Sequence, residues 1–204
     1  MSSFTYEKGN ICTPLETYEW DNTWIDQANN KDTPRVLYIG DSISCGIRRI
    51  ATERSGGKLL FDGFGSSKAL DNPYLYDAIS LLAAQEGCRR VVLFNNGLHG
   101  WHLEDTCEYL SLYEKAVEFM TKRFSDSAIV LVLTTSVQND EREKRVIVRN
   151  EAVNSVAKKY GLPVIDLYTV SKKLSSLHSD GVHFIREGYE GLADKSLTDI
   201  KKLI

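Results

Sequence analysis

The sequence predicts an α/β fold, a three-layer α/β/α sandwich around a parallel sheet of about five strands. Short apolar runs recur along the chain, and segments with a helical spacing of apolar residues lie between them. Strands that alternate with helices form βαβ units with right-handed crossovers, and helices then cover both faces of the sheet. The 204 residues, 42% hydrophobic and 26% charged, suffice to enclose one substantial core.

The predicted strands are continuous apolar runs, as expected for strands that are buried on both faces. The first run is followed directly by the turn Gly40-Asp41-Ser42. The five runs cover residues 36–39, 59–61, 91–94, 129–133 and 164–165. Apolar residues recur at helical intervals over 103–124 and 189–203, which predicts two amphipathic helices.

The first 34 residues differ from the rest of the chain. They are rich in Asp, Asn, Thr and aromatic residues without a clear period, so we expect residues 1–34 to form an irregular N-terminal arm that packs on a domain of residues 35–204. Tyr18, Trp20 and Trp24 are interpreted as anchors of this arm, with ligand stacking as the alternative. No repeat or low-complexity linker divides the remainder.

Charge and cysteine usage restrict the classes of partner and compartment. A formal net charge of -3 favours neither nucleic acid nor an anionic membrane as a partner. The N-terminal residues lack the apolar run of a secretory signal and no later stretch reaches the length of a membrane span, so we expect a cytoplasmic protein. The cysteines at 12, 45, 88 and 107 include no C-x-x-C pair, which favours reduced, mostly buried thiols.

Three polar segments follow predicted strands or lie in late turns, where α/β sheets bind ligands: residues 40–42, 95–99 and 180–183. A serine hydroxyl becomes a nucleophile when a base takes its proton and a third group orients that base. Ser42 opens the helix after the first strand, His183 can serve as the base, and Asp180 lies three residues before it. An oxyanion hole could draw on the Ser42 N–H, a glycine N–H near residues 63–65 and a side chain from 95–99.

Two of these segments resemble a known family. Ile39-Gly40-Asp41-Ser42-Ile43 and Asp180-Gly181-Val182-His183-Phe184, followed by Glu187-Gly188-Tyr189, are similar to the first and last motif blocks of the SGNH (GDSL-like) hydrolases. With the order of strands and helices, the resemblance covers roughly residues 35 to 204. It implies a flavodoxin-like sheet, no metal or organic cofactor, and hydrolysis of carboxylic esters through an acyl-enzyme on Ser42, with Asp180 and His183 completing the triad.

The sequence departs from the family pattern in the middle. The third block is usually Gly-x-Asn-Asp, whose asparagine donates to the oxyanion, whereas this chain has Gly97-Leu98-His99-Gly100. Aligned on the glycine, His99 takes the place of the asparagine, and a neutral imidazole N–H can make the same hydrogen bond. We favour His99 as the donor with Asn95 beside it in the site; the alternative is that Asn95 or Asn96 donates. For the second block, Gly65 is the preferred glycine among the candidates in 63–67.

Other interpretations of these residues compete with catalysis. Ser42 could be the N-cap of the following helix, and Asp41 is interpreted as a structural residue of the turn. Cys45 could be a thiol nucleophile, but a small core side chain is the preferred interpretation. His99 and His102 have the spacing of a metal pair on a helix, yet nearby glycines argue against a regular helix there, and no metal site is predicted.

The favoured function is a serine esterase that hydrolyses short acyl esters, especially acetyl esters of carbohydrates. The expected partner is therefore a small-molecule ester, and no oligomeric state is predicted. One alternative is a lysophospholipase or thioesterase acting on longer acyl chains. The other is a catalytically inactive binding module of the same fold.

Overall fold

The computed structural model describes residues 14–85 and 89–203 and confirms the predicted α/β class. A sheet with the strand order β1-β3-β2-β4-β5-β6 lies at its centre. Strands β2 to β6 are parallel, and β1 pairs antiparallel with β3 at one edge. The strands are β1 (Asp21–Trp24), β2 (Arg35–Gly40), β3 (Leu60–Ser66), β4 (Val91–Phe94), β5 (Ala128–Val132) and β6 (Val164–Ile165).

Each of the five predicted apolar runs corresponds to one of the parallel strands β2 to β6. Strand β1 was not predicted, because it lies within residues 1–34, which were expected to be irregular. Its four side chains are all exposed, so it has no apolar run, and backbone pairing along β3 from Asp21 opposite Ser66 to Trp24 opposite Gly63 holds it in the sheet.

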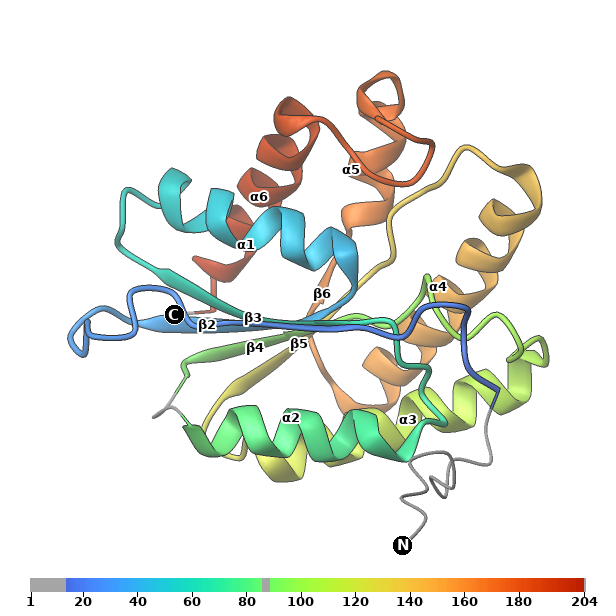
Figure 1. The fold of residues 1–204 in the computed structure, drawn as a ribbon, viewed down its shortest axis with the longest axis horizontal. Coiled ribbons are helices and arrows are strands. Elements are labelled where there is room, and N and C mark those ends of the chain that lie inside the picture. Colours follow the sequence, from blue (N-terminus) through green and yellow to red (C-terminus); the bar gives the residue numbers. More distant parts are fainter. Residues whose placement is uncertain (1–13, 86–88, 204) are drawn as a thin grey trace, which may run out of the picture.

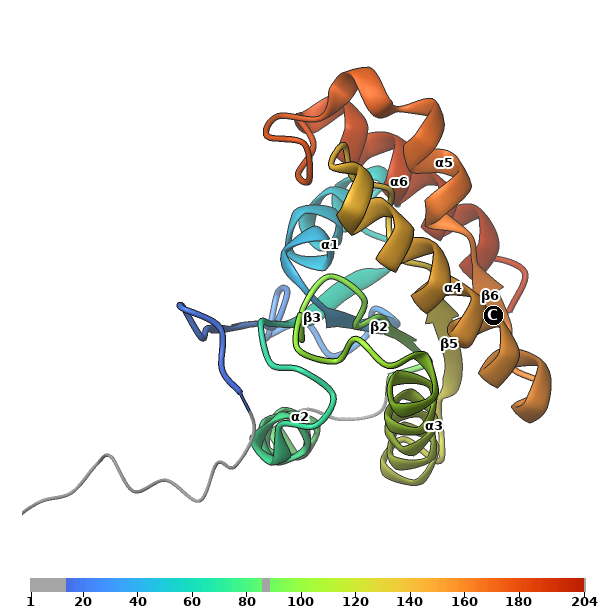
Figure 2. The ribbon, with the colours of Figure 1, turned by 90° about the vertical axis from the view of Figure 1, so that its right-hand side faces the viewer.

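Helices cover both faces of the sheet (Figures 1 and 2). Helices α1, α5 and α6 lie on one face, and α2 and α3 lie on the other, with α4 packed along α3. The helices are α1 (Ser42–Arg54), α2 (Pro73–Gln85), α3 (Thr106–Arg123), α4 (Asp140–Tyr160), α5 (Leu167–Lys173) and α6 (Arg186–Ile200), with a 3-10 turn at Ser175–Leu177. The helices predicted over 103–124 and 189–203 correspond to α3 and α6.

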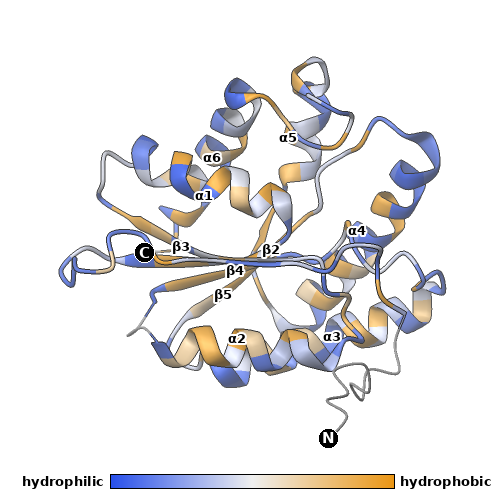
Figure 3. Ribbon diagram, in the orientation of Figure 1, coloured by the Kyte–Doolittle hydropathy of each residue, from blue (hydrophilic) through white to orange (hydrophobic). Residues whose placement is uncertain are grey.

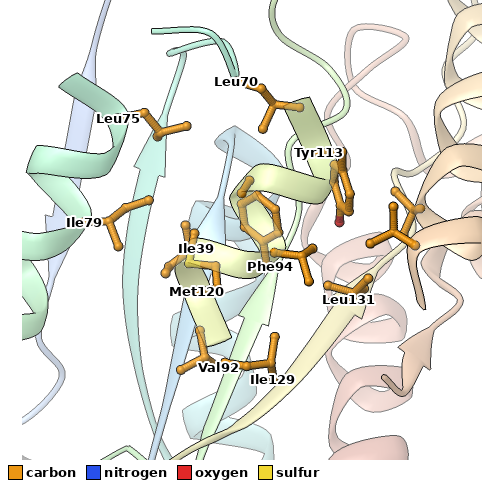
Figure 4. Packing of buried hydrophobic residues seen from close by; sticks show 14 of the residues in the cluster. Ile39, Leu70, Leu75, Ile79, Val92, Phe94, Tyr113, Met120, Ile129 and Leu131 are labelled. Carbon is orange, nitrogen blue, oxygen red and sulfur yellow. The ribbon is translucent and has the colours of Figure 1, made fainter. Parts of the chain in front are cut away.

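Alternate side chains of each central strand enter one of two hydrophobic cores. In β2, Leu37 and Ile39 face α2 and α3, whereas Val36 and Tyr38 face α1 and α6. Figure 3 shows apolar residues concentrated along the strands and the helix faces next to them. Figure 4 shows the α2 and α3 side of the sheet, where Phe94 and Met120 meet between the layers. Burial on both faces explains why the strands are continuous apolar runs.

The described cysteines differ from the expectation in one respect. Cys45 is a partly buried free thiol, but Cys107 is a free thiol exposed in the first turn of α3, so the expectation of mostly buried thiols is wrong for that residue. Cys12 and Cys88 lie outside the described residues. Within 14–85 and 89–203, no helix is both long and apolar enough to span a membrane.

Candidate active site

The turn between β2 and α1 presents Ser42 at the carboxyl edge of the sheet. Asp41 is the N-cap of α1, and its Oδ1 accepts the Ile43 N–H at 2.9 Å. The Asp41 carbonyl accepts the Ser44 hydroxyl at 2.6 Å, and a Cβ at Gly40 would lie 2.9 Å from the Ser44 Cβ. Because Asp41 caps the helix, the Ser42 hydroxyl is not needed for that purpose.

Ser42, His183 and Asp180 form one hydrogen-bonded chain. The Ser42 Oγ lies 2.8 Å from the His183 Nε2, and the His183 Nδ1 lies 2.7 Å from the Asp180 Oδ2. An ionised carboxylate only accepts hydrogen bonds, so Nδ1 carries the hydrogen and Nε2 has a lone pair toward the serine hydroxyl. This is the tautomer in which an imidazole can take a proton from a serine.

Asp180 is fixed by its own turn as well as by the imidazole. Its Oδ1 accepts the backbone N–H groups of Val182 at 3.0 Å and His183 at 2.7 Å. The hydrogen bond from the His183 side chain, followed by these two backbone bonds, holds the pKa of the Asp180 carboxyl far below its usual range. The Asp180 side chain is therefore an ionised carboxylate beside the His183 imidazole.

Backbone contacts hold the loop that carries Asp180 and His183. The Ser179 N–H donates to the His183 carbonyl and the Gln138 N–H to the Gly181 carbonyl, both at 2.8 Å. Gly181 has a φ of 85°, a conformation that favours glycine. Phe184 is buried below the loop. The loop thus has one defined path back to the end of β2.

Two groups next to Ser42 have pKa values changed by burial. Burial raises the pKa of the Asp41 carboxyl, and the imidazoles of His99 and then His183 oppose that rise. The Asp41 Oδ2 is buried without a hydrogen-bond partner among the described residues. Burial also raises the pKa of the Cys45 thiol, which disfavours the reactive thiolate and agrees with Cys45 as a packing residue rather than a nucleophile.

The three polar side chains considered as oxyanion donors lie in different surroundings. Asn95 is buried, and its Nδ2 donates to the Val132 carbonyl at 2.8 Å and the Thr134 hydroxyl at 2.9 Å. The Asn96 Nδ2 donates to the Lys68 carbonyl at 2.9 Å. Of these three, His99 is the one that lines the pocket containing Ser42. Both N–H bonds of Asn95 are used inside the protein.

Gly65 lies behind the turn that carries Ser42. It is paired with Gly40 in the parallel register of β2 and β3. A Cβ at Gly65 would lie 2.3 Å from the Cys45 Sγ and 3.3 Å from the Asp41 carbonyl oxygen. The absence of a side chain therefore allows β3 to approach the start of α1 closely.

The buried guanidinium of Arg149 holds the loop that carries His99. Its Nη1 donates to the carbonyls of Gly97 at 3.1 Å and His99 at 2.6 Å, and its Nη2 to those of Gly100 at 2.7 Å and Leu103 at 3.1 Å. The guanidinium carbon lies 4.6 Å from the centre of the Tyr109 ring. One side chain of α4 thus satisfies four carbonyls of a loop that lacks regular structure.

Glu16 contributes to the site from the N-terminal arm. Its carboxylate contacts the His99 Nδ1 at 3.0 and 3.1 Å and accepts the Gly100 N–H at 3.1 Å. Sequence analysis did not identify Glu16 or Arg149 as site residues. Glu16 lies in a segment without a period, and a single arginine in an otherwise polar helix gives no sign of burial.

A pocket of about 370 Å³ surrounds the chain of hydrogen bonds. Its lining includes Ser42, Glu16, His99, Trp101, Leu98, Val137, Arg142, Asp180, Val182 and His183. A second pocket of about 520 Å³ adjoins it, because Glu16 and Trp101 line both. Tyr18 and Trp20 line this second pocket, and Tyr18 is 81% exposed.

The aromatic residues of the arm therefore have different contacts. The Trp20 ring meets the His99 ring edge to face at 6.0 Å. Trp24 lies under the Arg49 guanidinium at 5.2 Å and outside both pockets, but it is exposed, which does not fit the interpretation of that residue as an anchor. Exposure of Tyr18 does not fit the interpretation of that residue as an anchor.

His102 belongs to the same loop as His99 but has a separate partner. Its Nε2 lies 2.8 Å from the Asp71 Oδ2, whereas His99 contacts Glu16. Among the described residues, no group of three or more His, Cys, Asp or Glu side chains is arranged to hold a metal ion. Each histidine is thus one half of a carboxylate pair.

No protein-family model matches the sequence, and no curated protein matches it either. Solved structures do match. A member of the lipolytic G-D-S-L family from Veillonella parvula superposes with a TM-score of 0.69 at 19% identity, covering 84% of this chain and 100% of that one. The lipase/acylhydrolase from Enterococcus faecalis has a TM-score of 0.64 at 17% identity, covering 83% and 96%.

A third similar structure is the acetyl xylan esterase AlAXEase, with a TM-score of 0.62 at 18% identity, covering 81% of this chain and 99% of that one. These likenesses confirm the fold expected from the two motif blocks. The chain has the fold of the SGNH (GDSL-like) hydrolases.

Proposed function

We propose that this chain is a carboxylic ester hydrolase that uses Ser42 as its nucleophile. The observation that carries the proposal is the chain of hydrogen bonds from Ser42 Oγ to His183 Nε2 at 2.8 Å and from His183 Nδ1 to Asp180 at 2.7 Å, within one pocket. The fold shared with lipolytic G-D-S-L proteins supports it.

The proposed reaction has two halves. As the Ser42 Oγ attacks the ester carbonyl carbon, His183 takes the hydroxyl proton and the carbonyl electron pair moves to its oxygen. The C–O bond to the alcohol then breaks, and His183 gives its proton to the leaving alkoxide, which leaves an acyl group on Ser42. Water then attacks the acyl carbon and gives a proton to His183. The bond from that carbon to Ser42 Oγ breaks as His183 returns the proton to Oγ, and the carboxylic acid leaves. Asp180 stabilises the imidazolium formed in each half.

The oxyanion that forms on the carbonyl oxygen needs hydrogen-bond donors. The Ser42 N–H is one candidate, because it lies at the N-terminus of α1, where the helix dipole favours negative charge. His99 is the second, as it lines the same pocket. Gly65 is the candidate second-block glycine beside the turn. Asn95 does not donate to the oxyanion in this proposal, because both of its N–H groups already donate to the Val132 carbonyl and the Thr134 hydroxyl. Its proposed role is to hold Thr134 in place.

For the substrate we propose a short acyl ester of a carbohydrate, with acetyl as the preferred acyl group. The pocket around Ser42 has three aliphatic side chains, Leu98, Val137 and Val182, among ionisable neighbours, which suits a small acyl group better than a fatty chain. The adjoining pocket offers aromatic faces, Tyr18 and Trp20, against which a sugar ring can pack. One structure of the same fold is an acetyl xylan esterase.

The test uses an aryl acetate and an aryl octanoate with the parent chain, Ser42→Ala and Cys45→Ala. We expect the acetate to be cleaved faster than the octanoate, Ser42→Ala to abolish turnover of both esters, and Cys45→Ala to retain it. Circular dichroism and thermal melts check that each variant is folded.

Each alternative predicts a different result. A lysophospholipase or thioesterase would prefer the octanoate and favour still longer chains in an acyl series. A catalytically inactive binding module would cleave neither ester. Turnover that survives Ser42→Ala would exclude the proposed nucleophile.

A further inference from the structure

The pocket around Ser42 contains a second pair of a carboxylate and a histidine, formed by Glu16 and His99. The two Glu16 oxygens lie 3.0 and 3.1 Å from the His99 Nδ1. Both residues line the pocket together with Ser42 and His183. The pair joins the N-terminal arm to the loop after β4, 83 positions further along the chain.

This contact determines which nitrogen of His99 carries a hydrogen. An ionised carboxylate only accepts, and one Glu16 oxygen also accepts the Gly100 N–H at 3.1 Å. The His99 Nδ1 is therefore the donor. If the ring is neutral, its Nε2 then has a lone pair and cannot donate to an oxyanion. If the ring is an imidazolium, Nε2 also carries a hydrogen.

The expectation that a neutral His99 could replace the usual asparagine donor thus conflicts with the contact to Glu16. An imidazolium resolves the conflict, because the carboxylate favours the cation and the cation has a free N–H. A charge-assisted hydrogen bond to an oxyanion is also roughly twice as strong as a neutral one.

Two further contacts hold the His99 ring in the pocket that contains Ser42. Arg149 holds the His99 carbonyl at 2.6 Å, and the Trp20 edge contacts the ring. The ring is therefore held from its backbone, from one side and at Nδ1.

We propose that Glu16 is a positioning residue that holds His99 as an imidazolium, so that the His99 Nε2–H stabilises the oxyanion formed when Ser42 attacks the ester. This inference rests on the proposed esterase function. During the attack, the Ser42 proton goes to His183, and His99 keeps both of its protons. The two histidines of the pocket thus have different roles: His183 takes and returns a proton, whereas His99 donates a hydrogen bond and keeps its protons.

The test is a double-mutant cycle on an aryl acetate with Glu16→Gln and His99→Asn, alone and together. Glutamine keeps an acceptor for Nδ1 but no longer favours the cation, so we expect kcat to fall roughly 10-fold to 100-fold, part of the 10²- to 10³-fold loss for a missing oxyanion donor. KM should stay within about twofold, because the lost interaction belongs to the transition state.

The second arm of the cycle separates this role from a structural one. Asparagine at 99 donates as a neutral amide, so His99→Asn should retain activity within about tenfold of the parent. In that background Glu16→Gln should change kcat by less than about twofold, because no imidazolium remains to be stabilised. An equal loss in both backgrounds would mean that Glu16 only anchors the arm, and no loss in either would mean that it has no role.

The protonation state is measured directly by 15N chemical shifts of the imidazole nitrogens at neutral pH, with the His99 signals assigned through their absence in His99→Asn. The proposal expects two protonated nitrogens in the parent and one in Glu16→Gln. A neutral His99 ring in the parent would overturn the proposal, whatever the activity of His99→Asn. This result does not depend on turnover, so it is distinguishable from failure of the esterase proposal, which Ser42→Ala reports.

Asp71→Asn is the matched control. It makes the same change of a carboxylate to an amide on the neighbouring pair with His102, which is 2.8 Å away, and Asp71 is not among the residues that line the Ser42 pocket. We expect its kcat on the aryl acetate to remain within about twofold of the parent. A loss as large as that of Glu16→Gln would attribute the effect to disturbance of the loop and contradict the proposal.

Discussion

His183 lies 141 positions after Ser42, yet its Nε2 is 2.8 Å from the serine Oγ. The fold produces this contact in two steps. Parallel strand β2 ends at the turn that holds Ser42, and the loop before α6 returns to the same edge with its backbone bonded to residue 138. The contact thus depends on the topology of the sheet and not on any local segment.

Replacing Asp180 tests the orientation of the base. In Asp180→Asn the amide no longer fixes the correct tautomer or stabilises the imidazolium, so we expect kcat on an aryl acetate to fall by roughly 10³- to 10⁴-fold. Steady-state kinetics measure it. Asp166→Asn, the same change at the N-cap of α5, should leave kcat unchanged, and a similar loss there would contradict the assignment.

Arg149 offers a test of how the His99 loop is held. Arg149→Met fills a similar volume but leaves four loop carbonyls without their donor, so we expect the free energy of unfolding to fall by about 2–4 kcal/mol. Urea denaturation measures this loss, and kcat should fall as well because His99 is displaced. Arg123→Met removes one bond to the Ser80 carbonyl and should cost clearly less; equal costs would refute the role of Arg149.

Gly65 should tolerate a side chain only if Cys45 is made smaller. The Cβ of Gly65→Ala would lie 2.3 Å from the Cys45 Sγ, so we expect a loss of about 1–3 kcal/mol in the free energy of unfolding. Cys45→Ala removes the sulfur atom, and the double variant should recover part of that loss. If the two single losses simply add in the double variant, the clash is not their link.

Asp41 predicts a pH-dependent stability. Burial raises its pKa in the folded state, so its contribution is most favourable below the unfolded pKa of about 3.9. It is lost as the pH rises through the folded pKa. Asp41→Asn keeps a capping oxygen without a charge. The stability of this variant relative to the parent should therefore increase as the pH rises across that window, measured by urea denaturation from pH 4 to 8. A relative stability that falls with pH would contradict this.

A substitution of Tyr18 tests whether the second pocket, which Tyr18 and Trp20 line, binds the sugar part of the ester. We expect Tyr18→Ala to lower the ratio of kcat/KM for an acetylated xylo-oligosaccharide to that for an aryl acetate by roughly threefold to tenfold. Tyr74, which is 39% exposed on α2 and outside both pockets, is the control. An unchanged ratio in Tyr18→Ala would remove this residue from the sugar site.

The strands and the serine turn could be predicted because their signals are local. A run such as 91–94 is apolar throughout because both of its faces are buried, and the Gly-Asp-Ser turn follows a strand directly in the sequence. Asp180 and His183 are only three residues apart, so their own contact is also local. That these two residues lie close to Ser42 could be expected only from the family resemblance, which supplied the fold.

The remaining site residues depend on contacts that the sequence does not encode locally. The position of Asn95 after β4 was predicted, but the direction of its amide, into the protein toward Thr134, depends on how the strand ends. Arg149 lies in a helix whose polar composition suggests exposure, although its side chain is buried under the His99 loop. Glu16 acts through a partner 83 positions away.

Strand β1 has a consequence for shortened versions of the protein. It covers the outer backbone of β3 over residues 63–66, so a chain that starts at residue 25 would expose an unpaired edge that contains Phe64, open to pairing with another molecule. The same deletion removes Glu16, Tyr18 and Trp20 from the pockets. Trimming this end for crystallisation or expression would therefore damage solubility and the substrate pocket together.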